Sequence, residues 1–105
     1  MGARESVRLA IQVARATGDL CGDAWEVWAD AWLVGKDRTA EGAVEAWGAA
    51  VSHIAAGAAR AACCLALADV SDAQAVASET ISDALWHAEQ AGKPIDLEQC
   101  KAAAE

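Results

Sequence analysis

Apolar residues recur every three or four positions along most of the chain, and this spacing is typical of amphipathic helices. Short stretches with glycine, proline and polar residues interrupt the pattern and mark where one helix ends and the next begins. Residues that favour strands are sparse, and alanine supplies much of the apolar content. The sequence therefore predicts an all-α protein with five helices, over residues 4–16, 23–34, 40–68, 72–90 and 97–104.

The predicted helix over residues 40–68 carries the most regular apolar pattern in the chain. Its apolar residues follow one another at spacings of three and four and form an unbroken seam of Val44, Trp47, Val51, Ile54, Ala58, Ala61 and Leu65. A second stripe, of small residues, consists of Gly48, Ala55, Ala59, Ala62 and Ala66. Because small residues let a neighbouring helix approach closely, a helix with both stripes is expected at the centre of the fold.

Polar residues and glycines mark the ends of the last two predicted helices. Ser71, with Gln74 three residues later, forms the pattern of a capping box, which predicts a helix start. Gly92 closes this helix and Pro94 prevents its continuation. The connections are short, so neighbouring helices are expected to be antiparallel. We expect one domain over residues 1–105: an antiparallel four-helix bundle, in up-down-up-down order, with a short C-terminal fifth helix.

Three of the five tryptophans, Trp25, Trp28 and Trp32, fall on one face of the second predicted helix. The chain has no tyrosine and no phenylalanine, so these indoles are the largest apolar side chains available to it. A buried tryptophan removes roughly 150–250 Å² from water. We expect the three to be core residues, with Trp47 and Trp86 contributing to the same core. The alternative is an exposed aromatic surface for a partner or for a second copy of the chain.

The chain is acidic, with a formal net charge of −8 and an isoelectric point near 4.6. This balance argues against direct nucleic-acid binding, which needs a basic surface. Residues 19–45 contain seven acidic residues against Lys36 and Arg38, and residues 69–89 contain five with no lysine or arginine. The first helix supplies the opposite charge as a basic stripe of Arg4, Arg8 and Arg15. We therefore expect a surface on which the charges are segregated.

Glu79, Asp83 and His87 follow one another at intervals of four residues, a stripe that could ligate a divalent metal. The alternative is a solvated face on which Asp83 pairs with His87 near a helix C-terminus. A second conceivable site joins His53 and His87, or either of them, with a cysteine, Cys63 or Cys64. These spacings match no zinc signature, and the Glu-x-x-His motif of di-iron bundles is absent. We expect no metal and no cofactor.

The sequence contains no motif of a common enzyme class. Gly-x-Gly-x-x-Gly, the P-loop, Gly-x-Ser-x-Gly and His-Glu-x-x-His are all missing. Serine, histidine and aspartate occur without a spacing that points to a catalytic triad. We expect a protein that is not an enzyme.

The cysteines and the apolar runs favour a cytoplasmic protein. Cys21, Cys63, Cys64 and Cys100 form no Cys-x-x-Cys pair, and at least one is expected to be a buried small apolar residue. Arg8 interrupts the apolar segment near the N-terminus, so no signal-peptide core is predicted. No run of about 18 apolar residues exists, which argues against a membrane span. Reduced thiols in the cytoplasm are the expectation.

These observations favour a non-catalytic protein that acts by protein–protein interaction. It would be an inhibitor, or an immunity or anti-defence protein, that occludes a basic, nucleic-acid-binding surface of its target. The alanine- and tryptophan-rich helical composition resembles that of various small phage and immunity proteins, although no motif carries the resemblance. The alternatives are a metal- or cofactor-binding bundle and a structural homo-oligomer such as a dimer. The residues predicted to pair with lysines and arginines of the partner are Glu26, Asp30, Glu79 and Asp83.

Overall fold

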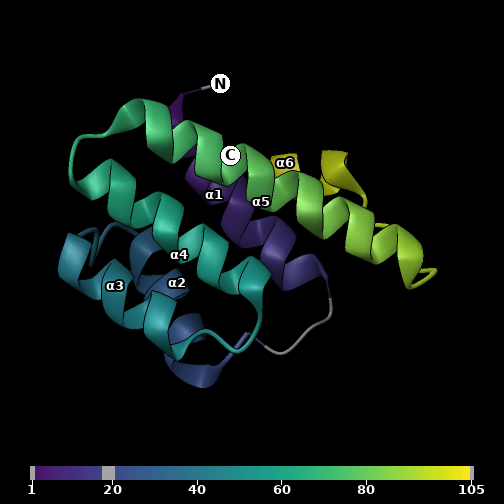
Figure 1. Ribbon diagram of the computed structural model, residues 1–105, viewed down its shortest axis with the longest axis horizontal. Coiled ribbons are helices and arrows are strands. Elements are labelled where there is room, and N and C mark those ends of the chain that lie inside the picture. Colours follow the sequence, from purple (N-terminus) through teal and green to yellow (C-terminus); the bar gives the residue numbers. More distant parts are fainter. Residues whose placement is uncertain (1, 18–20, 105) are drawn as a thin grey trace.

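The computed structural model describes residues 2–17 and 21–104, in which the regular secondary structure consists of helices, without strands (Figure 1). The predicted all-α class is confirmed. Asp19, one of the predicted acidic residues, lies outside the described residues. The helices are α1 (Ala3–Ala16), α2 (Asp23–Leu33), α3 (Ala40–Ala49), α4 (His53–Ala66), α5 (Val70–Gln90) and α6 (Leu97–Ala104).

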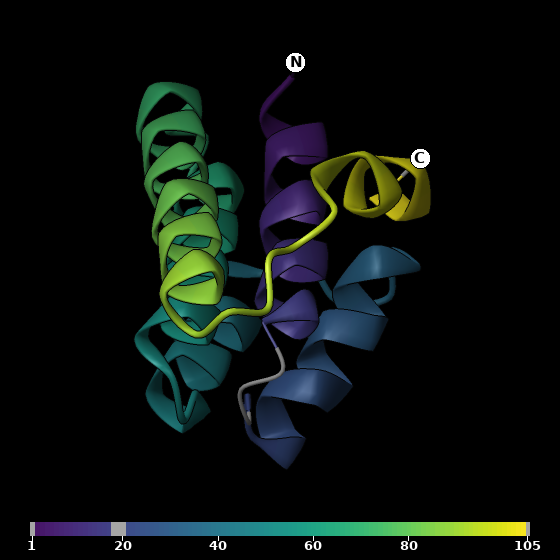
Figure 2. The same ribbon diagram turned by 90° about the vertical axis from the view of Figure 1, so that its right-hand side faces the viewer.

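Helix α4 holds a central place, because it packs against α1, α3 and α5. α4 and α5 lie side by side and run in opposite directions (Figure 1). α1 also packs against α5, and these two helices run in the same direction (Figures 1 and 2). α6 packs against α1, and α2 packs against α3 (Figure 2). The antiparallel four-helix bundle is therefore not confirmed, and α1 and α5 depart from the up-down-up-down order.

The single helix predicted over residues 40–68 is wrong, because the chain turns between α3 and α4. Ala50 is extended, with φ −66° and ψ 133°. The next amide, that of Val51, donates to the carbonyl oxygen of Cys21 at 3.1 Å. Ser52 is also extended and caps α4, since its hydroxyl accepts from the amide of Ala55 at 3.1 Å. A contact distant in sequence and a serine cap thus divide the segment into two helices.

The turn also divides the predicted apolar seam. Ile54, Ala58 and Ala61 are buried in α4, whereas Val44 and Val51 are exposed. In the small-residue stripe Ala55, Ala59 and Ala62 are buried in α4, whereas Gly48 of α3 and Ala66 at the end of α4 are exposed. The buried members of both stripes therefore all lie in α4, between Ile54 and Ala62.

The tryptophans of α2 are core residues, as the sequence predicts. Trp25, Trp28 and Trp32 are all buried, and the indole Nε1 of Trp25 donates to the carbonyl oxygen of Ala55 at 2.8 Å. This hydrogen bond ties α2 to the first turn of α4. The core assignment of the other two tryptophans is wrong, because Trp47 is 43% exposed and Trp86 is 58% exposed. Both lie on the outer sides of their helices, where the inward positions are taken by alanines.

Helix α5 begins at Val70, and its cap differs from the predicted one. The carboxylate of Asp69 accepts a hydrogen bond from the amide of Asp72 at 3.2 Å. Ala68, at a φ of 63°, adopts the left-handed conformation immediately before this cap. The capping box that begins at Ser71 is therefore wrong, since Ser71 already lies within the helix. Asp69 and Ser71 are both residue types that can cap a helix, and they are two positions apart. Because the chain turns at Ala68, Asp69 is the one at the helix start.

Replacing Asp69 by alanine is expected to lower the free energy of unfolding by about 0.5–2 kcal/mol, because the amide of Asp72 loses its acceptor. Asp69→Asn keeps an oxygen that can accept this bond, so its loss should be smaller. Ser71→Ala is the matched control and should change the free energy by less than about 0.5 kcal/mol, because Ser71 is exposed. Urea unfolding followed by circular dichroism measures all three. A larger loss for Ser71→Ala than for Asp69→Ala would contradict the observed cap.

Candidate interaction surface

The exposed side of α5 combines acidic and aromatic side chains. We call this set the α5 face; its members Asp72, Glu79, Asp83, Trp86 and His87 are all exposed. The helix contains no lysine or arginine, so no cation of its own neutralises these carboxylates. The inward side of α5 packs into the fold through Ala73, Ala77, Thr80, Ala84 and Ala88. The spacing of these small residues fixes which side of the helix faces the solvent.

Glu79 and Asp83 are one helical turn apart near the middle of the α5 face. No residue that the structure describes forms an ion pair with either carboxylate. Both charges are therefore available to an incoming cation without displacing an internal one.

Trp86 and two histidines form an aromatic group at the C-terminal end of the α5 face. The ring centroids of Trp86 and His87 are 5.3 Å apart, with nearly perpendicular planes. His53, the first residue of α4, brings its ring to 5.0 Å from that of His87. The structure thus brings together the two histidines that the sequence analysis considered as a pair.

Metal binding at this group finds no geometric support. Among residues 2–17 and 21–104, no group of three or more histidine, cysteine, aspartate or glutamate side chains is arranged to hold a metal ion. The stripe of Glu79, Asp83 and His87 therefore does not converge on one point. Its three side chains remain a row along the helix surface.

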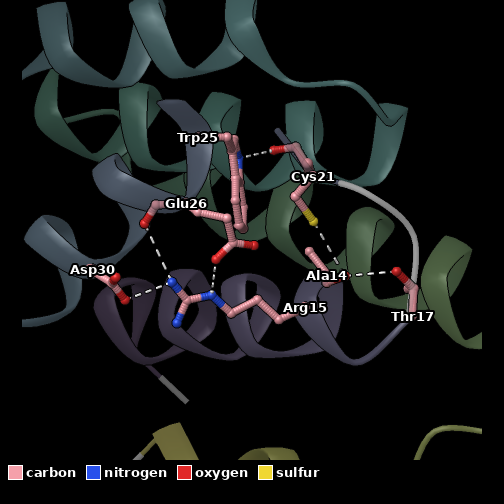
Figure 3. A network of polar contacts seen from close by, with 8 residues as sticks. Ala14, Arg15, Thr17, Cys21, Trp25, Glu26 and Asp30 are labelled. Carbon is pink, nitrogen blue, oxygen red and sulfur yellow. Dashed lines mark hydrogen bonds and ion pairs between the residues drawn. The ribbon is translucent and has the colours of Figure 1, made fainter. Parts of the chain in front are cut away.

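Glu26 and Asp30, the other two predicted partner-binding residues, lie on α2 and contact Arg15 of α1 (Figure 3). The Nε of Arg15 is 3.0 Å from Oε2 of Glu26, and its Nη2 is 2.7 Å from Oδ1 of Asp30. One guanidinium group thus bridges two carboxylates and links the helices. The side chains of Glu26 and Asp30 are still 43% and 74% exposed, so both remain accessible at the surface.

The two pairs of acidic residues lie on separate surfaces. α2 and α5 lie on opposite sides of α1 in the view of Figure 2. Glu79 and Asp83 are unpaired within the described part of the chain, whereas Glu26 and Asp30 share Arg15. Of the two surfaces, the α5 face offers the stronger attraction to a basic partner.

Sequence reasoning missed Trp86 as a surface residue because it assigned every large apolar side chain to the core. The signal was present in the spacing of the alanines. Ala77, Ala84 and Ala88 recur at seven and four residues and define the buried side of α5. Trp86 is two residues from Ala84 and Ala88, which places it on the opposite side of a helix with 100° per residue.

None of the four cysteines belongs to the α5 face. All four are free thiols, and Cys21, Cys63 and Cys100 are buried, as predicted for at least one of them. Burial, followed by the nearby charge of Asp96, raises the pKa of the Cys100 thiol. A raised pKa leaves less thiolate at neutral pH and lowers nucleophilic reactivity.

No protein-family model, curated protein or solved structure matches the chain. Across residues 2–17 and 21–104, no helix combines the length and the apolar character needed to cross a membrane. Function is therefore inferred from the surface chemistry of the chain itself.

Proposed function

We propose that the protein is a non-catalytic binding protein that engages a basic partner protein through the α5 face. The observation that supports this function is the exposed Trp86 one turn from Asp83, whose carboxylate forms no ion pair with any residue that the structure describes. Tryptophans flanked by polar groups are enriched among the residues that contribute most to protein interfaces. Carboxylates around such an anchor attract a basic partner and fix its orientation.

The partner would carry arginines and lysines on the contacting surface. Glu79 and Asp83 would pair with these cations while Trp86 enters an apolar pocket between them. Many basic protein surfaces bind nucleic acid, so occupation of such a surface would inhibit the partner. An inhibitor or an immunity or anti-defence protein works in this way. Glu26 and Asp30 would form a second, weaker contact, since each already shares the charge of Arg15.

The charge-reversal double variant Glu79→Lys/Asp83→Lys tests this function. The partner is isolated with the wild-type protein from its native host, and its affinity for each variant is measured by calorimetry. We expect the double variant to bind at least about tenfold more weakly, because two attractive charges become repulsive. The matched control is Glu41→Lys/Glu45→Lys on α3, which has the same spacing and the same change in net charge. It should bind like the wild-type protein.

Two results would contradict the proposal. Equal weakening by both double variants would mean that the partner responds only to the overall charge. Association that keeps the same rate between low and high salt would exclude electrostatic steering by the carboxylates.

A homo-oligomer is the second candidate function, and the exposed apolar residues of α3 favour it. Val44 and Trp47 lie on the outer side of α3, and Val51 follows in the turn, all three exposed. A second copy of the chain could cover them. The tryptophan face of α2 does not serve this purpose, since it is buried within the chain. Light scattering distinguishes a dimer from a monomer.

A further inference from the structure

A pocket of about 470 Å³ lies where the start of α1, the end of α2 and α4 meet. Its volume falls in the range of small-molecule sites, roughly 300–1,000 Å³. Arg4 and Arg38 supply its positive charge, and Glu5 is the one acidic residue of its lining. Ala62, Leu65 and the buried Trp32 add apolar surface. The pocket thus combines two guanidinium groups with an apolar wall.

Three arginines gather around this pocket in a chain that is otherwise acidic. Burial, followed by the positive charges of Arg4 and Arg8, lowers the pKa of Arg38. None of the three forms an ion pair with a carboxylate of the described residues. Like charges repel, so such a group costs free energy unless an anion joins it. Glu5 alone does not balance three guanidinium groups, and a net positive charge remains.

Arg38 is held in place by contacts that leave part of its guanidinium group available. Its Nε donates to the carbonyl oxygen of Trp32 at 3.0 Å, and its guanidinium carbon lies 4.5 Å from the centre of the Trp32 ring. The Nη groups are the part that can hold a phosphate or carboxylate through two parallel hydrogen bonds. A fixed guanidinium loses less side-chain entropy when a ligand binds.

Capping of α2 explains part of this arrangement but not all of it. Arg38 donates to the carbonyl oxygen of Trp32, and Arg8 donates to that of Leu33 at 3.1 Å, so both satisfy carbonyls at the helix C-terminus. Arg4 makes no such contact with any described residue, although it lines the same pocket. Capping of α2 therefore does not account for the guanidinium group of Arg4.

We propose that this pocket binds a small phosphate monoester, with the phosphate held by Arg4 and Arg38 and an apolar group placed against Leu65 and Ala62. A phosphate monoester carries about −1.5 to −2 charges at neutral pH, which suits a net positive pocket better than a single carboxylate does. The site involves other residues than the α5 face and does not depend on the proposed partner.

Calorimetry with phenyl phosphate as the probe tests the proposal on the intact chain. We expect binding to the wild-type protein, with benzoate at least about tenfold weaker and benzyl alcohol without detectable binding. Arg4→Gln should weaken phenyl phosphate by at least about tenfold. Arg4 is exposed and makes no described hydrogen bond, so this variant should fold normally, as circular dichroism can verify. The matched control is Arg60→Gln, which removes an exposed arginine of α4 that is not part of the pocket lining.

Several outcomes would overturn the proposal. One is the absence of binding at millimolar phenyl phosphate. Another is equal weakening by Arg4→Gln and Arg60→Gln, which would reveal attraction to the overall charge. Benzoate binding as tightly as phenyl phosphate would refute the choice of a phosphate. A second variant, Arg38→Lys, keeps the charge and removes the planar guanidinium, so unchanged affinity would refute the role of Arg38.

Discussion

Trp25→Ala is expected to lower the free energy of unfolding by about 3–5 kcal/mol, the largest effect of any single tryptophan substitution in this chain. The indole of Trp25 is fully buried, and its Nε1 donates to the carbonyl oxygen of Ala55. Alanine removes both the apolar area and the link between α2 and α4. Domains of this size are stable by only about 5–15 kcal/mol, so this single substitution should remove a large share of the free energy of unfolding.

Two further variants separate the causes of this loss. Trp25→Phe keeps an aromatic ring but removes the indole hydrogen bond, and about 1–3 kcal/mol should be lost. Trp86→Ala removes an equally large side chain from an exposed position and should cost less than about 0.5 kcal/mol. Each variant changes the number of fluorescent indoles, so tryptophan fluorescence is not a common signal for all three. Urea unfolding is therefore followed by far-ultraviolet circular dichroism. A cost for Trp86→Ala equal to that of Trp25→Ala would refute the assignment of core and surface.

The elements that the sequence predicted correctly are those fixed by local chemistry. The tryptophans of α2 share one face at spacings of three and four, and Gly35 follows the helix at a φ of 81°. α6 spans the predicted residues because Asp96 accepts from the amide of Gln99 at 3.2 Å, a cap that the sequence displays. In both cases residues within a few positions of each other determine the structure.

The turn at residues 50–52 could not be predicted in the same way. Trp47 before the turn, Val51 within it and Ile54 after it stay in phase with a continuous helix. The turn depends on the hydrogen bond between the amide of Val51 and the carbonyl oxygen of Cys21, which is thirty residues away. A helix-period pattern carries no information about such a contact.

The candidate sites show the same division between local and distant contacts. Glu79 and Asp83 were recognised because four residues separate them on one helix. The pairing of Glu26 and Asp30 with Arg15 was missed, because it requires α2 to lie alongside α1. The sequence shows the charged stripes on each helix. It does not show the helix packing, which pairs Glu26 and Asp30 with an arginine and leaves Glu79 and Asp83 exposed.

Gly57→Ala is expected to lower the free energy of unfolding by about 1–3 kcal/mol, because α4 approaches α5 closely at this position. A Cβ atom on Gly57 would overlap Oγ1 of Thr80 and lie 3.4 Å from its Cβ and Cγ2 atoms. Thr80 is buried and β-branched, and its hydroxyl donates to the carbonyl oxygen of Val76 at 2.8 Å. Turning Oγ1 away from the new methyl group would move it off the Val76 carbonyl, so the substitution costs either this hydrogen bond or the close packing of the two helices.

Gly48→Ala provides a control with the opposite sign. Gly48 also lies in a helix, but a Cβ atom there would meet no atom within 4 Å. Alanine should raise the free energy of unfolding by up to about 1 kcal/mol, because it has the higher helix propensity and restricts the unfolded chain. Comparing glycine-to-alanine changes at positions 48 and 57 thus separates the effect of helix propensity from that of interhelical packing. Urea unfolding measures the free energy of unfolding of both variants.

The double variant Gly57→Ala/Thr80→Ala identifies the contact that causes the loss. Removing Oγ1 and Cγ2 of Thr80 leaves only its Cβ, at 3.4 Å from the new methyl group. The double variant should therefore be more stable than the sum of the single changes predicts, by about 0.5–2 kcal/mol. Strict additivity would mean that the methyl group is accommodated elsewhere and that Thr80 does not set the distance between α4 and α5.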